Sequence, residues 1–478
     1  MSPLSHLVGR KYELGLLQRE YEKTSSSLIV LYGRRRIGKT RLITEFYEGK
    51  HLWKFDGVEG LTKPAQIKAQ LSQLSTLRQD KLYALVDCKN WVEFFKILNN
   101  AILKSPHKHR MTLFFDELPY IAGRQSELIA ALKWAWDNLW QDKPDFTLVL
   151  CGSIASFMIK KVVQSSALYG RISLEICLKA LSMLEVSDFF GKKKSIREIL
   201  NLYMFCGGVP EYLRQMDPKE SIAQNIARLA FCKDGYFVGE FARLFKDVFA
   251  EEAIYKKIIQ CLAQYKNLKV PELTQRLGVS AGGGFVEYLG NLESAGFIKS
   301  VIPWNSPPES KLKRYRLNDE YLLFYFKFIH PNLRKIQENT NPQSAFSYLN
   351  SRVYNIWAGF AFERLCLKHA SLIMQHLQID QLVKDYGAYF DRANNNKEGV
   401  QIDLLFLRHD PVVTLCEIKY HQGLIGKWII PELEKKVVLL EEPKKTIERV
   451  LITTEGITED LKDSQYFSRV LLADEIFG

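Results

Sequence analysis

The sequence lacks the features that would stabilise it by disulfides or zinc, or place it in a lipid bilayer. Its eight cysteines are scattered along 478 residues with no Cys-x-x-Cys pair, and no pair of histidines lies near them at the spacing of zinc ligands. This pattern favours reduced, buried thiols in a cytoplasmic protein. The first residues predict no signal peptide, and no apolar run reaches the roughly 18 residues of a membrane span. We therefore expect no membrane partner.

Positive charge, in contrast, is in excess. Lys and Arg number 66 against 54 Asp and Glu, which gives a formal net charge of +12. Apolar residues make up 47% and charged residues 25% of the chain, which excludes a wholly disordered or collagen-like protein. The length predicts about three or four domains. The charge favours a polyanionic partner such as nucleic acid, although an anionic membrane surface would attract it too.

The chain divides into segments of different pattern. Short apolar runs alternate with amphipathic helical patterns in the first part, which predicts a parallel α/β sheet. Its strands are expected at Ser27–Tyr32, near Lys81–Val86, at Thr112–Phe115 and at Thr147–Cys151. The pattern is helical from about 181 to 249, and from 251 to 318 it predicts three helices and two strands joined by the loop NSPPESKLK. The polar stretch QENTNPQ is expected to link this part to a final α/β unit.

A phosphate-binding motif follows the first strand. The residues from Gly33 to Thr40, GRRRIGKT, fit the pattern G-x-x-x-x-G-K-[ST] between an apolar strand and a helical pattern. Gly33 and Gly38 allow the backbone to bend so that successive N–H groups face a β-phosphate. Lys39 is expected to neutralise the β- and γ-phosphates of ATP, and the Thr40 hydroxyl to hold Mg²⁺.

Two carboxylates end the apolar strand MTLFF. Asp116 and Glu117 would be costly there without a cation nearby. We expect Asp116 to bind Mg²⁺ and Glu117 to orient or deprotonate the attacking water.

At these residues the chain resembles the AAA+ superfamily, in the branch of archaeal and bacterial ATPases related to STAND NTPases. The segments VGRKYELGLL, LVLCGSIASFM, LYGR and GGVPEYL carry the resemblance further. It implies that Gly9 and Arg10 lie by the adenine, that Ser153 lies near the γ-phosphate, and that GGVPEYL begins a helical lid. It also implies that Arg171 is a sensor or an arginine finger, in cis or across the interface of a homo-oligomer. The other residues expected to bind the nucleotide are Arg34, Arg35, Arg36, Ile37, Arg41 and Pro210.

The segment VPELTQRLGVSAGGGFVEYLGNLESAGFIKSV resembles a winged helix. Phe285, Leu289 and Leu292 fall on one face of its last helix, which carries Glu287 and Glu293 but no Lys or Arg. Base readout usually requires Arg, Lys, Asn or Gln at the groove. We therefore expect packing against the ATPase part, or phosphate contact through the basic residues Lys311, Lys313, Arg314 and Arg316, rather than sequence-specific readout.

Carboxylates and a lysine cluster near the C-terminus. Two strands, at about 400–407 and 412–420, are predicted to form a hairpin that places Asp403 beside Glu417 and Lys419. Counting along the preceding helix from Ile356 gives an apolar stripe in which Glu363 is the lone carboxylate and needs a partner. In one physical scheme Asp403 and Glu417 hold Mg²⁺, Lys419 positions the attacking water, and Glu363 completes the site.

These residues resemble the PD-(D/E)XK nuclease superfamily, whose pattern is Asp, a spacer and then Glu-x-Lys after a helix that carries Glu. Ile402 stands where that superfamily usually has proline. The resemblance implies four domains: an AAA+ P-loop ATPase over 1–178, a helical lid over 179–249, a winged helix over 250–330 and an α/β restriction-endonuclease-like domain over 345–478. The function hypothesis is an ATPase that gates Mg²⁺-dependent DNA cleavage. The alternatives are a STAND-like signalling or scaffolding ATPase whose last domain binds without cutting, and a DNA-stimulated motor or loader.

Overall fold

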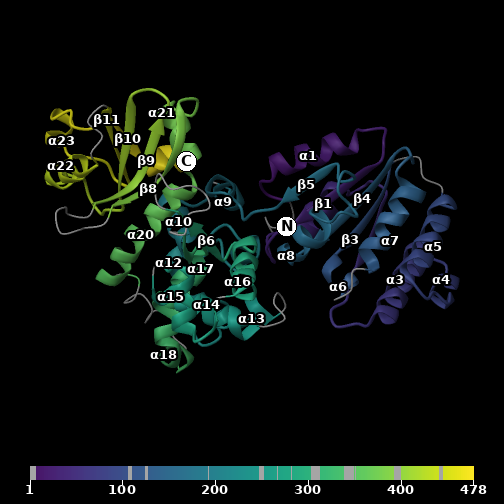
Figure 1. Cartoon of the computed structure of the whole chain (residues 1–478). Helices are drawn as coiled ribbons and strands as arrows, with labels where there is room; N and C mark the ends of the chain where they lie inside the picture. Colours follow the sequence, from purple (N-terminus) through teal and green to yellow (C-terminus); the bar gives the residue numbers. More distant parts are fainter. Residues whose placement is uncertain are drawn as a thin grey trace.

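The computed structural model describes residues 7–105, 110–123, 127–191, 193–246, 252–265, 267–280, 282–302, 313–338, 349, 351–391, 400–440 and 445–478. Figure 1 shows two sheet-containing lobes, formed by the start and the end of the chain, with a helical region between and beside them. Most of the loop NSPPESKLK, with Lys311, and the stretch QENTNPQ from residue 339 onward lie outside the described residues. No described helix is long and apolar enough to cross a membrane.

The first sheet has five parallel strands in the order β2-β3-β4-β1-β5. They are β1 (Ser27–Tyr32), β2 (Leu52–Asp56), β3 (Met111–Asp116), β4 (Phe146–Gly152) and β5 (Leu174–Cys177). Successive side chains of β1 enter two separate cores, Leu28 and Val30 on one face and Ile29 and Leu31 on the other. Because both faces are covered, β1 is apolar throughout and its strand prediction is confirmed.

The helices of this lobe cover the two faces of the sheet (Figure 1). They are α1 (Lys11–Tyr21), α2 (Lys39–Phe46), α3 (Lys63–Arg78), α4 (Leu82–Leu85), α5 (Trp91–Leu103), α6 (Leu118–Ala122), α7 (Glu127–Ala135), η1 (Trp136–Trp140), α8 (Ala155–Phe157) and η2 (Met158–Val163).

The strand predicted near Lys81–Val86 is wrong, because this segment contains the short helix α4. The Asp80 carboxylate accepts a hydrogen bond from the backbone N–H of Leu82 at 3.0 Å, which starts a helical turn. Leu82 and Leu85 are largely exposed, whereas a strand inside a parallel sheet must be buried. The position beside β3 belongs to β2, whose alternate residues Trp53 and Phe55 are buried.

A helical region follows, as the pattern predicted. Its elements are α9 (Met183–Phe190), α10 (Ile196–Cys206), α11 (Pro210–Leu213), α12 (Ile222–Phe231), α13 (Glu240–Lys246), α14 (Glu252–Gln264), α15 (Val270–Leu277), α16 (Gly283–Ser294), the antiparallel pair β6 (Ile298–Val301) and β7 (Arg314–Leu317), then α17 (Glu320–Phe324), η3 (Tyr325–Ile329), η4 (His330–Asn332) and α18 (Leu333–Glu338). The predicted order of three helices and two strands is confirmed between α14 and β7.

The last lobe contains a mixed five-stranded sheet in the order β12-β11-β10-β9-β8. Its elements are α20 (Arg352–Lys368), α21 (Ala370–Leu377), β8 (Val383–Asp391), β9 (Val400–Arg408), β10 (Val412–Lys419), α22 (Ile429–Leu439), β11 (Thr446–Thr453), α23 (Glu459–Asp463), β12 (Arg469–Leu472) and α24 (Ala473–Phe477). The predicted hairpin is present as β9 and β10, and β10 pairs in parallel with β11.

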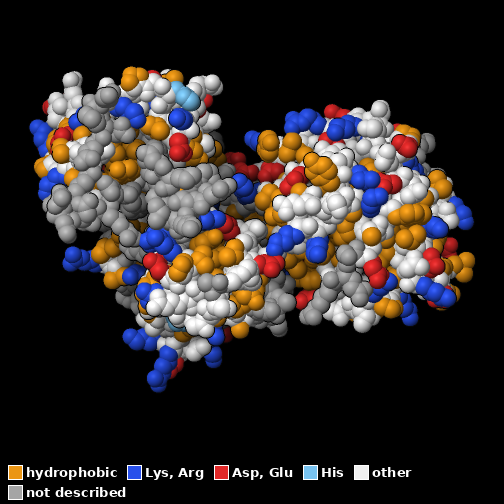
Figure 2. Space-filling view, viewed as in Figure 1, with side chains coloured by type: hydrophobic (Ala, Val, Ile, Leu, Met, Phe, Trp, Pro, Cys, Tyr) orange, Lys and Arg blue, Asp and Glu red, His pale blue; other side chains and the backbone are white. Residues whose placement is uncertain are grey.

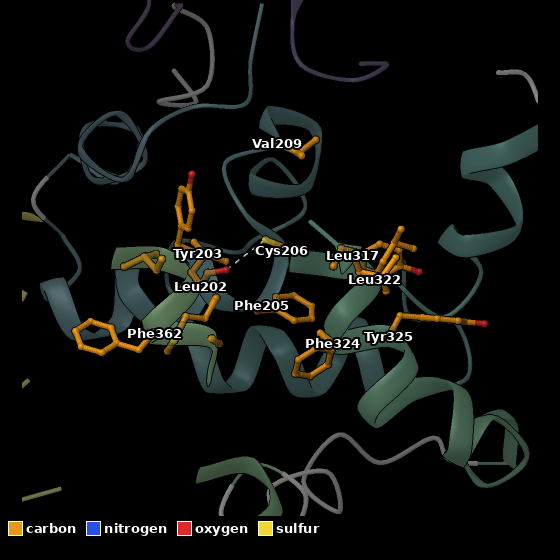
Figure 3. Close-up of a cluster of buried hydrophobic side chains, with 14 of the residues drawn as sticks. Leu202, Tyr203, Phe205, Cys206, Val209, Leu317, Leu322, Phe324, Tyr325 and Phe362 are labelled. Carbon is orange, nitrogen blue, oxygen red and sulfur yellow. Dashed lines mark hydrogen bonds between the residues drawn. The ribbon is translucent and has the colours of Figure 1, made fainter. Parts of the chain in front are cut away.

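One hydrophobic core joins the helical region to the last lobe. It extends from Leu181 to Phe477, and Figure 3 shows part of it. Phe324 of α17 lies edge-on to Phe205 of α10, with ring centroids 4.6 Å apart, and to Trp357 of α20, 5.3 Å apart. Because such aromatic contacts bury large apolar area, α10, α17 and α20 are packed as one unit. The domain boundaries predicted within 179–478 remain an interpretation of the sequence.

This shared core predicts the effect of truncating its central ring. We expect Phe324→Ala to lower the free energy of unfolding by about 3–5 kcal/mol, because the cavity lies where three helices meet. The exposed Val353 of α20 provides the control, since Val353→Ala should change stability by less than about 0.5 kcal/mol. Urea unfolding followed by tryptophan fluorescence measures both. A loss below about 1 kcal/mol for Phe324→Ala would contradict a shared core.

Candidate nucleotide site and C-terminal carboxylate cleft

The phosphate-binding loop connects β1 to α2 and depends on two glycines. Gly33 has φ of 147° and Gly38 has φ of 88°, values that side chains other than hydrogen rarely permit. A Cβ on Gly33 would also lie 2.3 Å from the carbonyl oxygen of Leu178. These glycines let the backbone turn sharply and deliver the chain to the N-terminus of α2, where unpaired N–H groups favour an anion.

Lys39 lies across this loop. Its Nζ donates hydrogen bonds to the carbonyl oxygens of Gly33, at 3.1 Å, and Arg34, at 3.0 Å, and the residue is buried. Within the described part of the chain, Lys39 has hydrogen bonds to these neutral carbonyls but no carboxylate partner. A phosphate in the loop would supply the counter-charge.

The residues predicted to hold Mg²⁺ lie together at the ends of the loop and of β3. Thr40 Oγ1 donates to Asp116 Oδ2 at 2.6 Å, and Nζ of Lys54 lies 3.6 Å from the same oxygen. Lys54, on β2, was not identified from the sequence because a single lysine in a short strand gives no motif. The hydroxyl and carboxylate oxygens are ligands of the kind that Mg²⁺ prefers, so this pair fits the ion.

Glu117 is held by the neighbouring strand. Its Oε2 accepts hydrogen bonds from the backbone N–H of Ser153, at 3.2 Å, and from its hydroxyl, at 2.7 Å. The positive φ of Glu117, 48°, ends β3 and turns the chain into α6. The two residues predicted near the γ-phosphate are therefore in contact with each other.

Segments far apart in the sequence meet at the loop. Nη2 of Arg10 donates to the carbonyl oxygen of Ile37 at 3.0 Å, and the backbone N–H of Arg10 donates to Oε1 of Glu185, in α9, at 2.6 Å. An added Cβ on Gly9 would lie 2.6 Å from that Glu185 oxygen, and the positive φ of Gly9, 72°, also favours glycine there. Pro210, at the start of α11, has Cγ 4.0 Å from the Cβ position of Gly38. The predicted entry and lid residues thus border the loop.

The arginines of the loop bind the helical region through their side chains. Arg34 forms an ion pair with Asp319 and donates to the hydroxyl of Tyr212 at 3.3 Å. Arg36 forms an ion pair with the buried Glu240. Because both side chains are already paired, the backbone N–H groups of Arg34 and Arg36 are left to bind a nucleotide. Arg41 pairs within α2, and the expected roles of Arg35 and Arg41 stay predictions.

Arg171 has a partner of its own. Its Nε lies 2.6 Å from Oδ1 of Asp137 and its Nη2 donates to Oδ2 at 2.9 Å, and these hydrogen bonds lower the pKa of Asp137. This two-pronged pair would have to break before Arg171 could reach a phosphate. Its role as a sensor or finger stays a prediction.

The four residues predicted near the C-terminus line a single cleft of about 370 Å³. Asp403 comes from β9, Glu417 and Lys419 from β10, and Glu363 from α20. Oδ2 of Asp403 accepts a hydrogen bond from the backbone N–H of Ile418 at 3.1 Å, across the hairpin. The other lining residues are Val400, Gln401, Glu432, Lys435, Lys436 and Leu439.

Two lysines enclose the buried Glu417. Nζ of Lys436 donates to its two carboxylate oxygens at 2.8 and 2.7 Å, and Nζ of Lys419 lies 2.8 Å from Oε1. Lys419 also lies 3.1 Å from Glu432. Sequence reasoning missed Lys436 and Glu432 of α22. Their spacing of four residues, which pairs opposite charges on a helix, was the available signal.

Burial and crowding make the other carboxylates weak acids. Burial, reinforced by the charge of Asp403, raises the pKa of Glu363 to about 7. Burial and the charge of Glu417 raise the pKa of Asp403 to about 6. A cation in the cleft would relieve this repulsion. The oxygens of Asp403 and Glu417 suit Mg²⁺, although Lys436 would have to release Glu417, and the described residues contain no preformed group of three metal-binding side chains.

The helix of Glu363 buries a different face from the one predicted. Ile356 and Phe360 of the expected apolar stripe are exposed, while the buried side includes Trp357, Phe362 and Leu365. Apolar residues occupy both sides of this helix, so periodicity alone chose the wrong one. Glu363 lies at the edge of the buried side, at the cleft.

Comparisons with known proteins support the ATPase prediction for the first half of the chain. Residues 7–216 match a family described as an ATPase domain predominantly from Archaea, and residues 325–438 match a family of archaeal and bacterial proteins of unknown function. An uncharacterised protein of Methanocaldococcus jannaschii is 27% identical over 86% of this chain and 87% of its own. An uncharacterised ATP-binding protein of the same organism is 51% identical over 45 residues, which are 9% of this chain and 76% of its own. The Walker-type ATPase of Pyrococcus abyssi aligns with 67% of this chain and 96% of its own, at 21% identity and a TM-score of 0.48.

The family match, the parallel sheet and the loop between β1 and α2 lead to the same assignment. The matched residues contain the glycine-rich loop, Lys39, Thr40 and the strand that ends in Asp116. Residues 7–216 therefore match an ATPase domain found predominantly in Archaea, and their parallel sheet and glycine-rich loop are those of a P-loop ATPase.

Proposed function

We propose that this protein is an ATP-dependent switch that controls metal-dependent cleavage of DNA by its C-terminal domain. The observation that carries the proposal is the convergence of Glu363, Asp403, Glu417 and Lys419 on one cleft of a chain that also has a P-loop. The net charge of +12 supports a polyanionic substrate. Figure 2 shows Lys and Arg side chains distributed over both lobes on the face that it displays.

In the ATPase half, Thr40 and Asp116 would hold Mg²⁺, which would neutralise phosphate charge when bound. Lys39 neutralises the phosphates and Glu117 orients the attacking water, with its own carboxylate held by Ser153. The contacts of Arg10 and Pro210 support lid segments that respond to an occupied loop.

In the C-terminal half, Asp403 and Glu417 would hold Mg²⁺, which neutralises the phosphodiester and acidifies its bound water when present. Lys419 then orients the attacking water beside Glu417. Glu363, with its raised pKa, exchanges a proton near neutral pH at the edge of the cleft. The side chains in these roles are positioned by the strands β9 and β10 and by the helix α20.

The segment from α14 to β7 we interpret as a winged helix that packs rather than reads bases. Glu287 of α16 forms an ion pair with Lys160 of η2 at 2.7 Å, so this helix is attached to the ATPase lobe. A helix that pairs a carboxylate with a neighbouring lobe and carries no basic residue is poorly suited to the major groove.

A series of contacts leads from the loop to the cleft and supports the gating. Arg34 of the loop pairs with Asp319, and the adjacent Glu320 lies 2.7 Å from Nζ of Lys368, on α20. Since α20 also carries Glu363, a change at the loop that displaced Asp319 would be passed to the helix that lines the cleft. The two sites can be coupled only if ATP at the loop and DNA at the cleft both shift the equilibrium between the same two arrangements of these helices.

A scaffold that binds without cutting is the second candidate. Lys436 neutralises both oxygens of Glu417, which is the arrangement expected of a cleft that no longer needs a metal. The motor or loader is favoured by none of these contacts.

For ATP use, we expect Lys39→Ala to lose nucleotide affinity, because the phosphates lose their buried cation. Glu117→Gln should bind ATP with unchanged affinity and hydrolyse it at least about 100-fold more slowly, since the amide cannot activate water. A fluorescent ATP analogue and a phosphate-release assay measure the two quantities. Hydrolysis at the wild-type rate by Glu117→Gln would show that another group activates the water.

For cleavage, plasmid and linear DNA incubated with the full chain and Mg²⁺ or Mn²⁺ should be cut, and chelation should stop it. Glu417→Gln and Lys419→Ala should each cut at least about 100-fold more slowly. Glu434→Gln is the matched control, because Glu434 is on the same helix as Lys436 but pairs with Arg449 outside the cleft. Intact DNA with every metal would favour the scaffold, and equal cutting by the three variants would show that the cutting does not depend on this cleft.

For gating, the test is Asp319→Asn. Asp319 caps α17 by accepting a hydrogen bond from the N–H of Leu322 at 2.7 Å, and asparagine keeps such a cap while it removes the charge that holds Arg34. ATP should change the wild-type cleavage rate by about 5–150-fold. The variant should cut DNA and bind ATP but lose that response, and a retained response would rule out this route.

A further inference from the structure

Three positive side chains, on elements that come from different parts of the chain, are linked through Arg316. Lys299 and Arg316 are directly opposite each other on β6 and β7. Arg364, on α20, follows Glu363 in sequence and lies close enough to Arg316 for the two charges to repel. Nothing in the β6–β7 pairing requires two positive residues to face each other, and like charges placed in this way destabilise a sheet.

The two arginines have no partner that explains their positions. The Nε of Arg316 is buried without a hydrogen bond. Within the described residues, neither guanidinium makes a hydrogen bond or an ion pair, and the nearby Glu320 is engaged by Lys368. The buried Arg110 provides the contrast, because its guanidinium donates to Thr147, Ser27 and three carbonyl oxygens. The fold therefore satisfies a structural arginine fully elsewhere.

Burial lowers the pKa values of all three positive groups. Burial lowers the pKa of Arg364 to about 10, with the repulsion of Arg316 acting against the attraction of Glu320 and Glu363. Burial lowers the pKa of Arg316, and burial and Arg316 lower that of Lys299. Buried donors without an acceptor cost free energy, and an anion between them would remove both the desolvation and the repulsion.

We propose that Arg316 and Arg364, with Lys299, form a binding site for a backbone phosphate of DNA next to the C-terminal cleft. Guanidinium groups bind phosphate through two parallel N–H donors, and two of them from a hairpin and a helix can hold one phosphate from both sides. The choice of DNA rests on the proposed function, because Arg364 directly follows a residue of the cleft in which a phosphodiester would lie. The site would fix the strand and carry no sequence information.

The experiment measures binding of a fluorescent DNA duplex to the full chain in EDTA, where no cleavage occurs, over a series of salt concentrations. The double variant Arg316→Gln/Arg364→Gln should bind roughly tenfold more weakly at low salt, whatever the duplex sequence. Its salt slope should be smaller by about one for each phosphate that it no longer binds. Arg334→Gln is the matched control, since Arg334 is almost fully exposed on α18, and it should match the wild type.

Two further measurements distinguish a DNA phosphate site from a structural role of the arginines and from a site for a small anion. Arg364→Gln should melt at or above the wild-type temperature, because it removes a partly buried charge that makes no hydrogen bond or ion pair among the described residues, whereas a structural arginine would destabilise the protein when replaced. Binding and salt slope of the double variant equal to those of Arg334→Gln would overturn the proposal. Stabilisation of the wild type by inorganic phosphate, with DNA binding unchanged in the double variant, would also overturn it in favour of a small anion. Failure to cut DNA with metal would count against the proposed function alone, since this test uses no metal.

Discussion

The ion pair between Arg34 and Asp319 is the contact on which the organisation of this molecule depends. One partner is part of the loop that holds phosphates, and the other begins the helix that is packed into the shared core of the helical region and the last lobe. A charge pair that is almost fully buried is costly to separate, because each group would be left without its counter-charge. This pair, together with the ion pair between Arg36 and Glu240, restrains the loop against the shared core. Nucleotide phosphates beside Arg34 would compete for the same positive charge that holds Asp319.

The C-terminal cleft has a second electrostatic constraint. Four carboxylates and three lysines line a space of about 370 Å³, and the two carboxylates that lack a direct lysine contact, Glu363 and Asp403, have raised pKa values. Such a balance is sensitive to one added cation, which would replace Lys436 at Glu417 and let the other acids ionise. The arginine pair beside the cleft is the opposite case, an excess of positive charge without an anion. The two regions are linked by α20, which carries both Glu363 and Arg364, and in our proposal a phosphodiester with its metal would complement both.

The parts that sequence reasoning predicted are those with a local physical cause. The glycines of the loop, the buried strand Ser27–Tyr32, the strand that ends in Asp116 and the hairpin that bears Asp403 each follow from a motif or a period within a few residues. Partners that arrive from distant segments were not predicted. Lys436 reaches Glu417 from a helix that gave no motif, and the side chains of Arg34 and Arg36 turn to carboxylates more than 200 residues away. The strand predicted near Lys81–Val86 was wrong for the same reason. The distant strand β2 occupies the position beside β3, so this segment stays outside the sheet.

The most direct test of the account uses the reciprocity of coupling. If ATP changes the affinity of the C-terminal cleft for DNA, DNA bound at the cleft must change the affinity for ATP by the same factor. The measurement is the dissociation constant of ATP for the slowly hydrolysing Glu117→Gln protein, with and without saturating DNA in the presence of Ca²⁺. We expect a shift of about fivefold or more, abolished in Asp319→Asn. Equal constants with and without DNA would contradict it and leave two sites that work independently.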